Sequence, residues 1–101
     1  MKRAAINLDD IKRLLKEHKK EVRRKYRVIK IGVFGSYVRG EQKERSDIDI
    51  LVSFSGIPDV FKYIELEEYL KRLLRRRVDL VRKEAIRPEL KKRILKEAVY
   101  V

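Results

Sequence analysis

Apolar side chains near the start of the chain recur first with the spacing of a helix and then with that of a buried strand. The positions spaced by three and four residues are Leu8, Ile11, Leu15, His18 and Val22. Asn7 is a residue type that caps helices, so the pattern predicts an amphipathic helix over about residues 8–26. The next segment, RVIKIGVF at 27–34, becomes wholly apolar and predicts a strand that enters a buried sheet.

The middle of the chain repeats this alternation of helix and strand. Residues 36–40, SYVRG, are long enough for one or two helical turns that end at Gly40, and the polar loop EQKERS follows. The segment DIDILVSF at 47–54 predicts a second strand, and Asp59 is placed to begin a helix. The apolar stripe of that helix comprises Tyr63, Leu66, Leu70, Leu73 and Leu74. Such a stripe predicts a helix that packs on the sheet.

A third strand and a last helix complete the predicted order αβαβαβα. The segment RVDLV at 77–81 has the alternation of a strand, and Pro88 suits the first turn of a helix. The expected buried side of this helix comprises Leu90, Ile94, Leu95 and Ala98. We therefore expect residues 1–101 to form one α+β (α/β-like) domain, in which helices pack on one face of a small mixed sheet of three or more strands.

Two aspartates interrupt the apolar run of the second predicted strand. Side chains two positions apart on a strand share a face, so Asp47 and Asp49 lie side by side, opposite Ile48 and Ile50. The same parity puts Asp79 of the third strand on the face opposite the core. Neighbouring carboxylates repel one another unless a cation lies between them. Oxygen ligands without His or Cys favour Mg²⁺ or Mn²⁺, and such a cluster can hold two ions about 3.5–4 Å apart for displacement at phosphorus.

A candidate phosphate-binding turn lies at the end of the first predicted strand. Gly35 allows the backbone to turn sharply and approach an anion, and the short helix that follows points its free N–H groups toward it. The Ser36 hydroxyl adds a donor, and Arg39, one helical turn on, can reach a phosphate oxygen from the same side. The alternative is an ordinary strand-to-helix turn, in which Ser36 caps the helix and Arg39 bridges Glu41.

The spacing of these residues resembles a known signature. Gly-Ser at 35–36, ten further residues and Asp-Ile-Asp at 47–49 are similar to the motif of the DNA polymerase beta nucleotidyltransferase superfamily. The segment GSYVRGEQKERSDIDILV resembles in particular the minimal nucleotidyltransferases, and the likeness continues through RRRVDLV to RPELKKRILKEAVYV at the C-terminus. The resemblance covers nearly the whole chain and implies a polymerase beta-like nucleotidyltransferase fold.

The resemblance also implies roles for the matching positions. Gly35 and Ser36 would hold the triphosphate of ATP, while Asp47 and Asp49 would bind two Mg²⁺ ions. Asp79 would bind the ion that activates the attacking hydroxyl and would accept its proton. Minimal nucleotidyltransferases are commonly paired with a HEPN-domain ribonuclease toxin and act as antitoxins by transferring AMP to one of its tyrosines. The implied reaction is therefore protein adenylylation.

Charge and composition bear on the other function classes. The formal net charge is +12, from 28 basic and 16 acidic side chains, yet residues 31–70 carry four basic and eight acidic ones. Nucleic-acid contact by the basic outer segments, including nucleotide addition to RNA ends, rests on this charge alone. The absence of cysteine excludes disulfides, thiolate metal sites and cysteine nucleophiles. Without an apolar run of about 18 residues or a secretion signal, we expect a cytoplasmic protein and no membrane partner.

An antitoxin that neutralises its toxin by binding alone is the main alternative to an enzyme, and homo- or hetero-oligomers suit either. The C-terminal EAVYV at 97–101 can serve such a contact or complete the core. Leu51 and Val81, expected on the carboxylate face, can receive a base or a partner. Tyr37 can stack on a base but is better explained by core packing, and His18 is expected at the boundary of the core. The paired aspartates can form salt bridges instead of binding metal.

Overall fold

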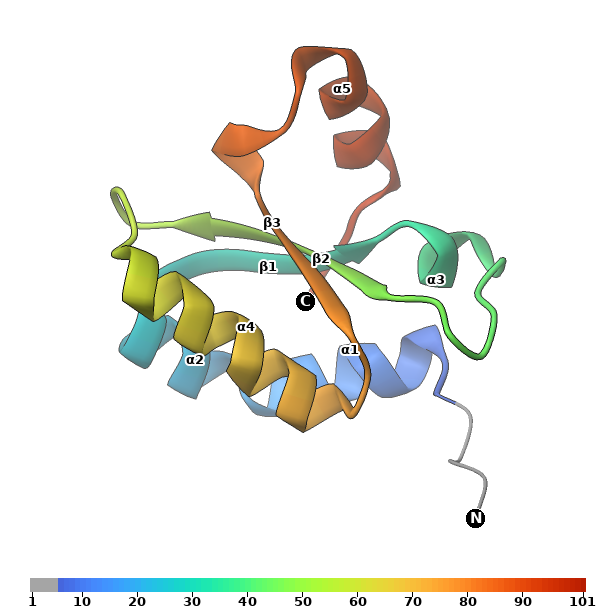
Figure 1. The fold of residues 1–101 in the computed structure, drawn as a ribbon, viewed down its shortest axis with the longest axis horizontal. Helices are drawn as coiled ribbons and strands as arrows, with labels where there is room; N and C mark the ends of the chain where they lie inside the picture. The colour runs from blue at the N-terminus through green and yellow to red at the C-terminus, as the bar shows by residue number, and fades with distance from the viewer. Residues whose placement is uncertain (1–5) are drawn as a thin grey trace.

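The computed structural model describes residues 6–101, and a four-stranded mixed sheet forms its centre (Figure 1). In the order in which they lie side by side, the strands are β3 (Val78–Arg82), β2 (Ile48–Phe54), β1 (Val28–Phe34) and β4 (Val99–Tyr100). β2 pairs parallel with β3, whereas β1 pairs antiparallel with both β2 and β4. The prediction of a small mixed sheet with three or more strands is therefore confirmed.

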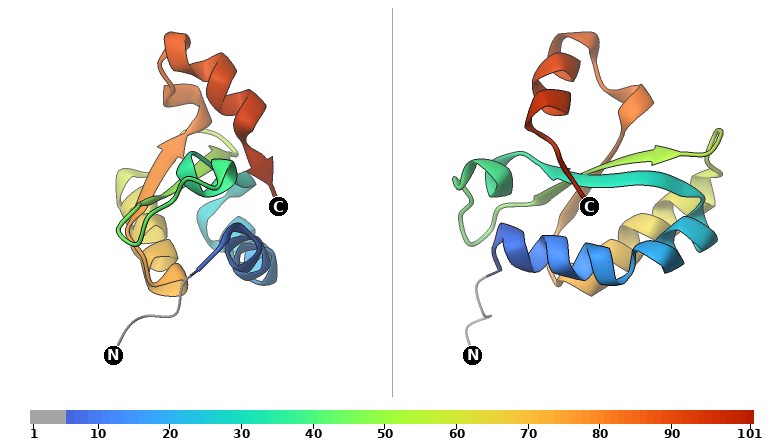
Figure 2. Two further views of the ribbon diagram at one scale, coloured as in Figure 1. Left: turned by 90° about the vertical axis from the view of Figure 1, so that its right-hand side faces the viewer. Right: turned by 180° about the vertical axis from the view of Figure 1, so that it is seen from behind.

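Three helices cover one face of this sheet, and a further helix lies on the other side. In Figure 1, α1 (Leu8–Glu17), α2 (Lys19–Tyr26) and α4 (Val60–Leu74) lie beneath the sheet, whereas α5 (Pro88–Glu97) rises above it. Figure 2 shows the same layers from two further sides. The helical layer on one face was predicted, and α5 adds partial cover to the second face. Within residues 6–101, no helix is long and apolar enough to cross a membrane.

The segment predicted as one helix over 8–26 forms two helices that meet at His18. His18 has φ −104° and ψ 5°, so its backbone departs from helical geometry and α1 ends there. Its backbone N–H donates to the carbonyl oxygen of Leu14 at 3.2 Å, and its Nδ1 lies 2.9 Å from the same oxygen. A capping box between Asn7 and Asp10 begins α1, which confirms Asn7 as the N-cap. His18 is half-buried, as expected for a residue at the boundary of the core.

The main core lies between the sheet and the three helices on its covered face. Ile48 and Ile50 of β2 are fully buried in it, together with Ile11 of α1 and Leu66 of α4. These β2 residues occupy the alternate positions whose parity predicted burial. Tyr37 belongs to the same cluster, so the prediction that it packs in the core is confirmed.

A smaller core lies on the opposite face, under α5. Phe34, Leu51 and Ile94 are buried together there, with Val81 partly buried at their edge. Leu51 is therefore fully covered and Val81 partly covered, which corrects the expectation that both are open to a base or a partner. Leu90 was expected on the buried side of α5 but is 37% exposed, because the first turn of α5 lies away from the sheet (Figure 1).

The chain ends in a strand rather than in a helix. β4 pairs Tyr100 with Gly32 and Val99 with Val33 at the edge of the sheet. Gly32 permits this approach, because a Cβ there would lie 2.8 Å from the carbonyl oxygen of Val99. Within the C-terminal EAVYV, β4 adds an edge strand to the predicted order, and Ala98 and Val101 pack at the margins of the two cores, which agrees with the expected role of completing the core. Two short helical segments, α3 (Ser36–Arg39) and η1 (Lys83–Ala85), follow β1 and β3.

Replacing Ile50 with alanine should lower the free energy of unfolding by about 2–5 kcal/mol, because the change removes buried methyl groups and leaves a cavity. Ile50 is fully buried, whereas Ile57 in the turn before α4 is 93% exposed. Ile57→Ala is therefore the matched control and should change stability by less than about 0.5 kcal/mol. Guanidinium chloride denaturation followed by circular dichroism measures both, and equal losses would contradict this assignment of the core.

Candidate active site

The three aspartates lie near one another at the end of the sheet where β1 ends and where β2 and β3 begin. Parallel pairing sets Asp49 directly opposite Asp79, and antiparallel pairing sets Asp49 opposite Phe34, the residue before Gly35. Asp47 was expected inside the second strand, but it lies one residue before β2. The register of the sheet therefore gathers Gly35 and the aspartates at one place, and the roles of these residues stay predictions.

Gly35 lies directly against the carboxylate of Asp49. Its backbone has φ 80° and ψ −151°, a combination that is essentially restricted to glycine. A Cβ at this position would overlap Oδ2 of Asp49. Only a residue without a side chain lets the strand end in contact with Asp49 and turn at once into the next helix.

That next helix is α3, which Ser36 begins. The backbone N–H groups of Val38 and Arg39 donate to the carbonyl oxygen of Gly35 at 3.0 and 3.2 Å. Gly40 ends the helix in the left-handed conformation. The short helix predicted for residues 36–40 is therefore confirmed, and Ser36 occupies its first turn in a half-buried position.

Asp49 has a strongly perturbed carboxylate. Burial, and after it the charges of Asp79 and Asp47, together raise its pKa to about 6, against an opposing effect of Arg39. A carboxylate that is both desolvated and close to two others gains most from a nearby cation. The donor set therefore fits a hard divalent cation such as Mg²⁺. Within residues 6–101, however, no three His, Cys, Asp or Glu side chains form a ready-made metal cluster.

Asp47 forms one of the salt bridges that the sequence left open, and its partner is Arg77, which the sequence did not single out. Its Nε lies 3.0 Å from Oδ1 of Asp47, and its Nη2 donates to the carbonyl oxygen of Arg45 at 3.1 Å. The parallel register accounts for the pair, because Asp47 and Arg77 immediately precede the paired residues Ile48 and Val78. The Arg77 side chain is 75% exposed, and pairs of this kind contribute about 0–1 kcal/mol. Asp47 can thus exchange this partner for another cation.

Arg39 donates to two carboxylates. Its Nε donates to Oε2 of Glu41 at 2.9 Å, the bridge that the sequence left open, and its Nη1 donates to Oε1 of Glu97 at 2.7 Å. Glu97, the last residue of α5, also accepts a hydrogen bond from the backbone N–H of Gly35 at 2.9 Å. Sequence reasoning missed Glu97, since no local pattern shows that a residue 58 positions beyond Arg39 returns to this turn. A phosphate contact of Arg39 stays a prediction.

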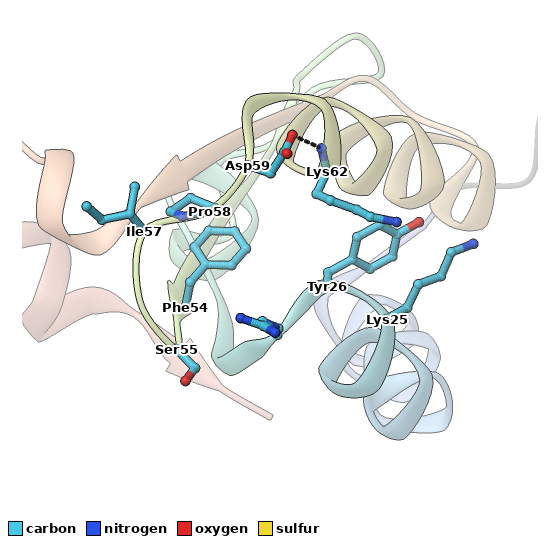
Figure 3. A pocket seen from close by; sticks show the side chains of 9 residues that line it. Lys25, Tyr26, Phe54, Ser55, Ile57, Pro58, Asp59 and Lys62 are labelled. Atoms are coloured by element: carbon cyan, nitrogen blue, oxygen red, sulfur yellow. Dashed lines mark hydrogen bonds between the residues drawn. The ribbon is translucent and has the colours of Figure 1, made fainter.

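A separate pocket of about 310 Å³ lies at the other end of β2 (Figure 3). Its walls combine the aromatic rings of Tyr26 and Phe54 with the basic side chains of Lys25, Arg27 and Lys62. Phe54 is the last residue of β2, whereas the aspartates lie at its start, so the length of the strand separates the two places. This pocket is therefore not part of the candidate active site.

Asp49→Asn should stabilise the metal-free protein at about pH 8. Burial and the neighbouring carboxylates raise the pKa of Asp49 from 3.8 to about 6, so its charged form opposes folding above that pH. After a discount for solvent screening, we expect a gain of about 1–2 kcal/mol at pH 8. The gain should shrink as the pH falls through 6 and vanish near 3.8, where the acid becomes protonated in the unfolded chain as well.

Guanidinium chloride denaturation across this pH range provides the measurement. Glu84→Gln, an exposed carboxylate on η1, is the control and should show no such pH-dependent gain. A gain for Asp49→Asn that does not vary with pH would contradict the electrostatic explanation.

Gly35→Ala should cost more stability than Gly40→Ala and should also move the carboxylate of Asp49. Both glycines have positive φ, but a Cβ on Gly35 meets Asp49, whereas a Cβ on Gly40 meets nothing within 4 Å. Gly40→Ala should therefore cost only the backbone strain of about 1–2 kcal/mol. Carbon NMR of the aspartate carboxyl groups should show a changed pKa of Asp49 in Gly35→Ala and an unchanged one in Gly40→Ala.

Comparison with known proteins assigns the chain to a family. Residues 15–101 match the model of the nucleotidyltransferase domain family. The protein adenylyltransferase MntA of Thermococcus cleftensis is 55% identical over 98 residues, which are 97% of this chain and 99% of the relative. The similarity therefore extends over both proteins almost completely.

Solved structures support the same assignment. A chain assigned as a minimal nucleotidyltransferase superposes with a TM-score of 0.81 at 30% identity, and the match covers 96% of this chain and 98% of that one. A toxin–antitoxin structure with AMP-PNP superposes with a TM-score of 0.70 at 29% identity, covering 84% of this chain and 69% of that one. The expected minimal nucleotidyltransferase fold is confirmed, and the chain belongs to the nucleotidyltransferase domain family.

Proposed function

We propose that this protein is a Mg²⁺-dependent protein adenylyltransferase, which transfers AMP from ATP to a tyrosine hydroxyl of a HEPN-domain toxin and so acts as an antitoxin. The observation that carries the proposal is that the Gly35–Ser36 turn lies beside Asp47, Asp49 and Asp79 at the end of the sheet where β2 and β3 begin. Nucleotidyl transfer requires a phosphate-binding turn, here called the phosphate seat, beside oxygen ligands for metal ions. The relative at 55% identity, a protein adenylyltransferase, supports a protein as the acceptor.

Different residues of the chain would bind the triphosphate, bind the metal ions and accept the proton in this reaction. The Gly35 backbone and the Ser36 hydroxyl would hold the triphosphate, with Arg39 as a further phosphate donor. Asp47, Asp49 and Asp79 would hold Mg²⁺, which when bound neutralises charge that develops on the entering and leaving oxygens. The tyrosine oxygen attacks the α phosphorus, a new P–O bond forms, and the bond to pyrophosphate breaks. Asp79 would accept the proton of the hydroxyl.

The exposure of the site suits an acceptor that belongs to another protein. Asp47 and Asp79 are both exposed, so a tyrosine from a second chain can approach them from solvent. The toxin–antitoxin structure with AMP-PNP, similar to this chain at 29% identity, supports a toxin as the acceptor protein and ATP as the nucleotide. We place the reaction in the cytoplasm, where ATP is available.

The double variant Asp47→Asn with Asp49→Asn should reduce AMP transfer roughly a thousandfold or more, because loss of the cation removes several kcal/mol of stabilisation from the transition state. The purified protein is mixed with its HEPN-domain partner, ATP and Mg²⁺, and the intact mass of the partner is recorded. With the wild-type protein, the partner should gain one or more AMP units.

Glu84→Gln is the matched control, since this exposed carboxylate on η1 lies outside the site and should leave transfer unchanged. Transfer at the full rate in the double variant would overturn the metal-site assignment. If the wild-type protein neutralises the toxin without any gain of mass, inhibition by binding alone is the correct function. Nucleotide addition to RNA but not to protein would instead identify a nucleic-acid-modifying enzyme.

A further inference from the structure

The donors proposed to hold the triphosphate are already engaged by one carboxylate of the same chain. Oε2 of Glu97 accepts a hydrogen bond from the Gly35 backbone N–H at 2.9 Å, and Oε1 accepts one from Nη1 of Arg39 at 2.7 Å. One carboxylate oxygen of Glu97 therefore binds the turn at Gly35, and the other binds the guanidinium of Arg39 on α3. The Glu97 side chain is only 14% exposed, whereas the Arg39 side chain is 43% exposed, so the bond from Gly35 is better shielded from water than the bond from Arg39.

A shielded carboxylate with charge-assisted bonds at both oxygens is a strong ligand for its donors. Burial disfavours the charged form of Glu97, but the hydrogen bonds from Arg39 and Gly35 outweigh burial and hold its pKa below the ordinary value. Glu97 therefore carries its negative charge at neutral pH. In charge and in the number of accepting oxygens, it resembles the edge of a phosphate group.

The Gly35 backbone has one N–H, and this N–H cannot serve Glu97 and a phosphate oxygen at full strength together. We propose that Glu97 competes with the triphosphate for Gly35 and Arg39 and thereby sets the affinity of the protein for nucleotide. This inference rests on the proposed function, because it takes the Gly35 turn to be the phosphate seat. Binding of the nucleotide requires the carboxylate of Glu97 to leave that seat.

The surroundings of Glu97 allow the side chain to leave without unfolding of α5. Ile94 anchors the end of this helix in the core that it shares with Phe34 and Leu51. Arg93, one turn earlier on α5, also attracts the Glu97 carboxylate and offers it another partner. Arg39 also pairs with Glu41 at 2.9 Å, so departure of Glu97 would not leave the guanidinium without a carboxylate partner.

The test measures binding by titration calorimetry for three proteins: the wild type, Glu97→Gln and Glu89→Gln. Each is titrated with inorganic tripolyphosphate without metal and with ATP in the presence of Mg²⁺. Glu97→Gln keeps the shape of the side chain and removes its charge, so both ligands should bind about tenfold more tightly. Glu89 is an exposed carboxylate at the start of the same helix, and Glu89→Gln should bind as the wild type does. The difference should persist in about 0.5 M salt, where interactions between distant exposed charges are screened.

Equal affinity in Glu97→Gln and wild type would overturn the inference. Weaker binding in Glu97→Gln would also overturn it, because Glu97 would then position the seat rather than compete for it. These outcomes separate the inference from the proposed function. If Glu97→Gln binds more tightly but the wild-type protein transfers no AMP to the toxin, the competition stands and the acceptor assignment fails. If AMP transfer is observed and Glu97→Gln binds no more tightly, the proposed function stands and the competition fails.

Discussion

Asp49 is the residue on which the candidate active site depends, because it pairs with both neighbouring strands at the end of the sheet. Its partners are Phe34 of β1 and Asp79 of β3, so one register fixes the end of β1 and the starts of β2 and β3. A slip of β2 by one residue would turn Asp49 toward the helices and the core residues of this strand toward the other face. The pairing that buries Ile48 and Ile50 therefore also places the carboxylates.

The same register keeps an unfavourable arrangement of charges in place. Burial, together with the charges of Asp79 and Asp47, raises the pKa of Asp49 to about 6. In water these groups would separate, but here each belongs to a strand, or adjoins a strand, whose other face lies in the main core. Apolar packing on one face thus holds repelling carboxylates on the other. A cation that binds between them would relieve this repulsion. Because apolar packing holds the carboxylates close together in advance, it would increase their affinity for such a cation.

Features that depend on neighbouring residues could be predicted from the sequence, and features that depend on distant ones could not. The parity of β2 and the turn at Gly35 are local, so the aspartate face and the strand-to-helix turn were both predictable. The break at His18 was not, because the apolar spacing continues through it while the backbone does not. β4 has two residues, too few to show alternation. The contacts of Glu97 depend on how α5 crosses the sheet, which no local pattern contains.

The free site carries an internal partner for each kind of ligand that it is proposed to bind. Arg77 supplies a cation at Asp47, and Glu97 supplies an anion at Gly35 and Arg39. The two partners differ in strength, because the Arg77 side chain is 75% exposed and makes one ion pair with Asp47, whereas the Glu97 side chain is 14% exposed and uses both oxygens. Water and salt weaken the first contact much more than the second. For the proposed ligands, displacement of Glu97 should therefore cost more free energy than displacement of Arg77.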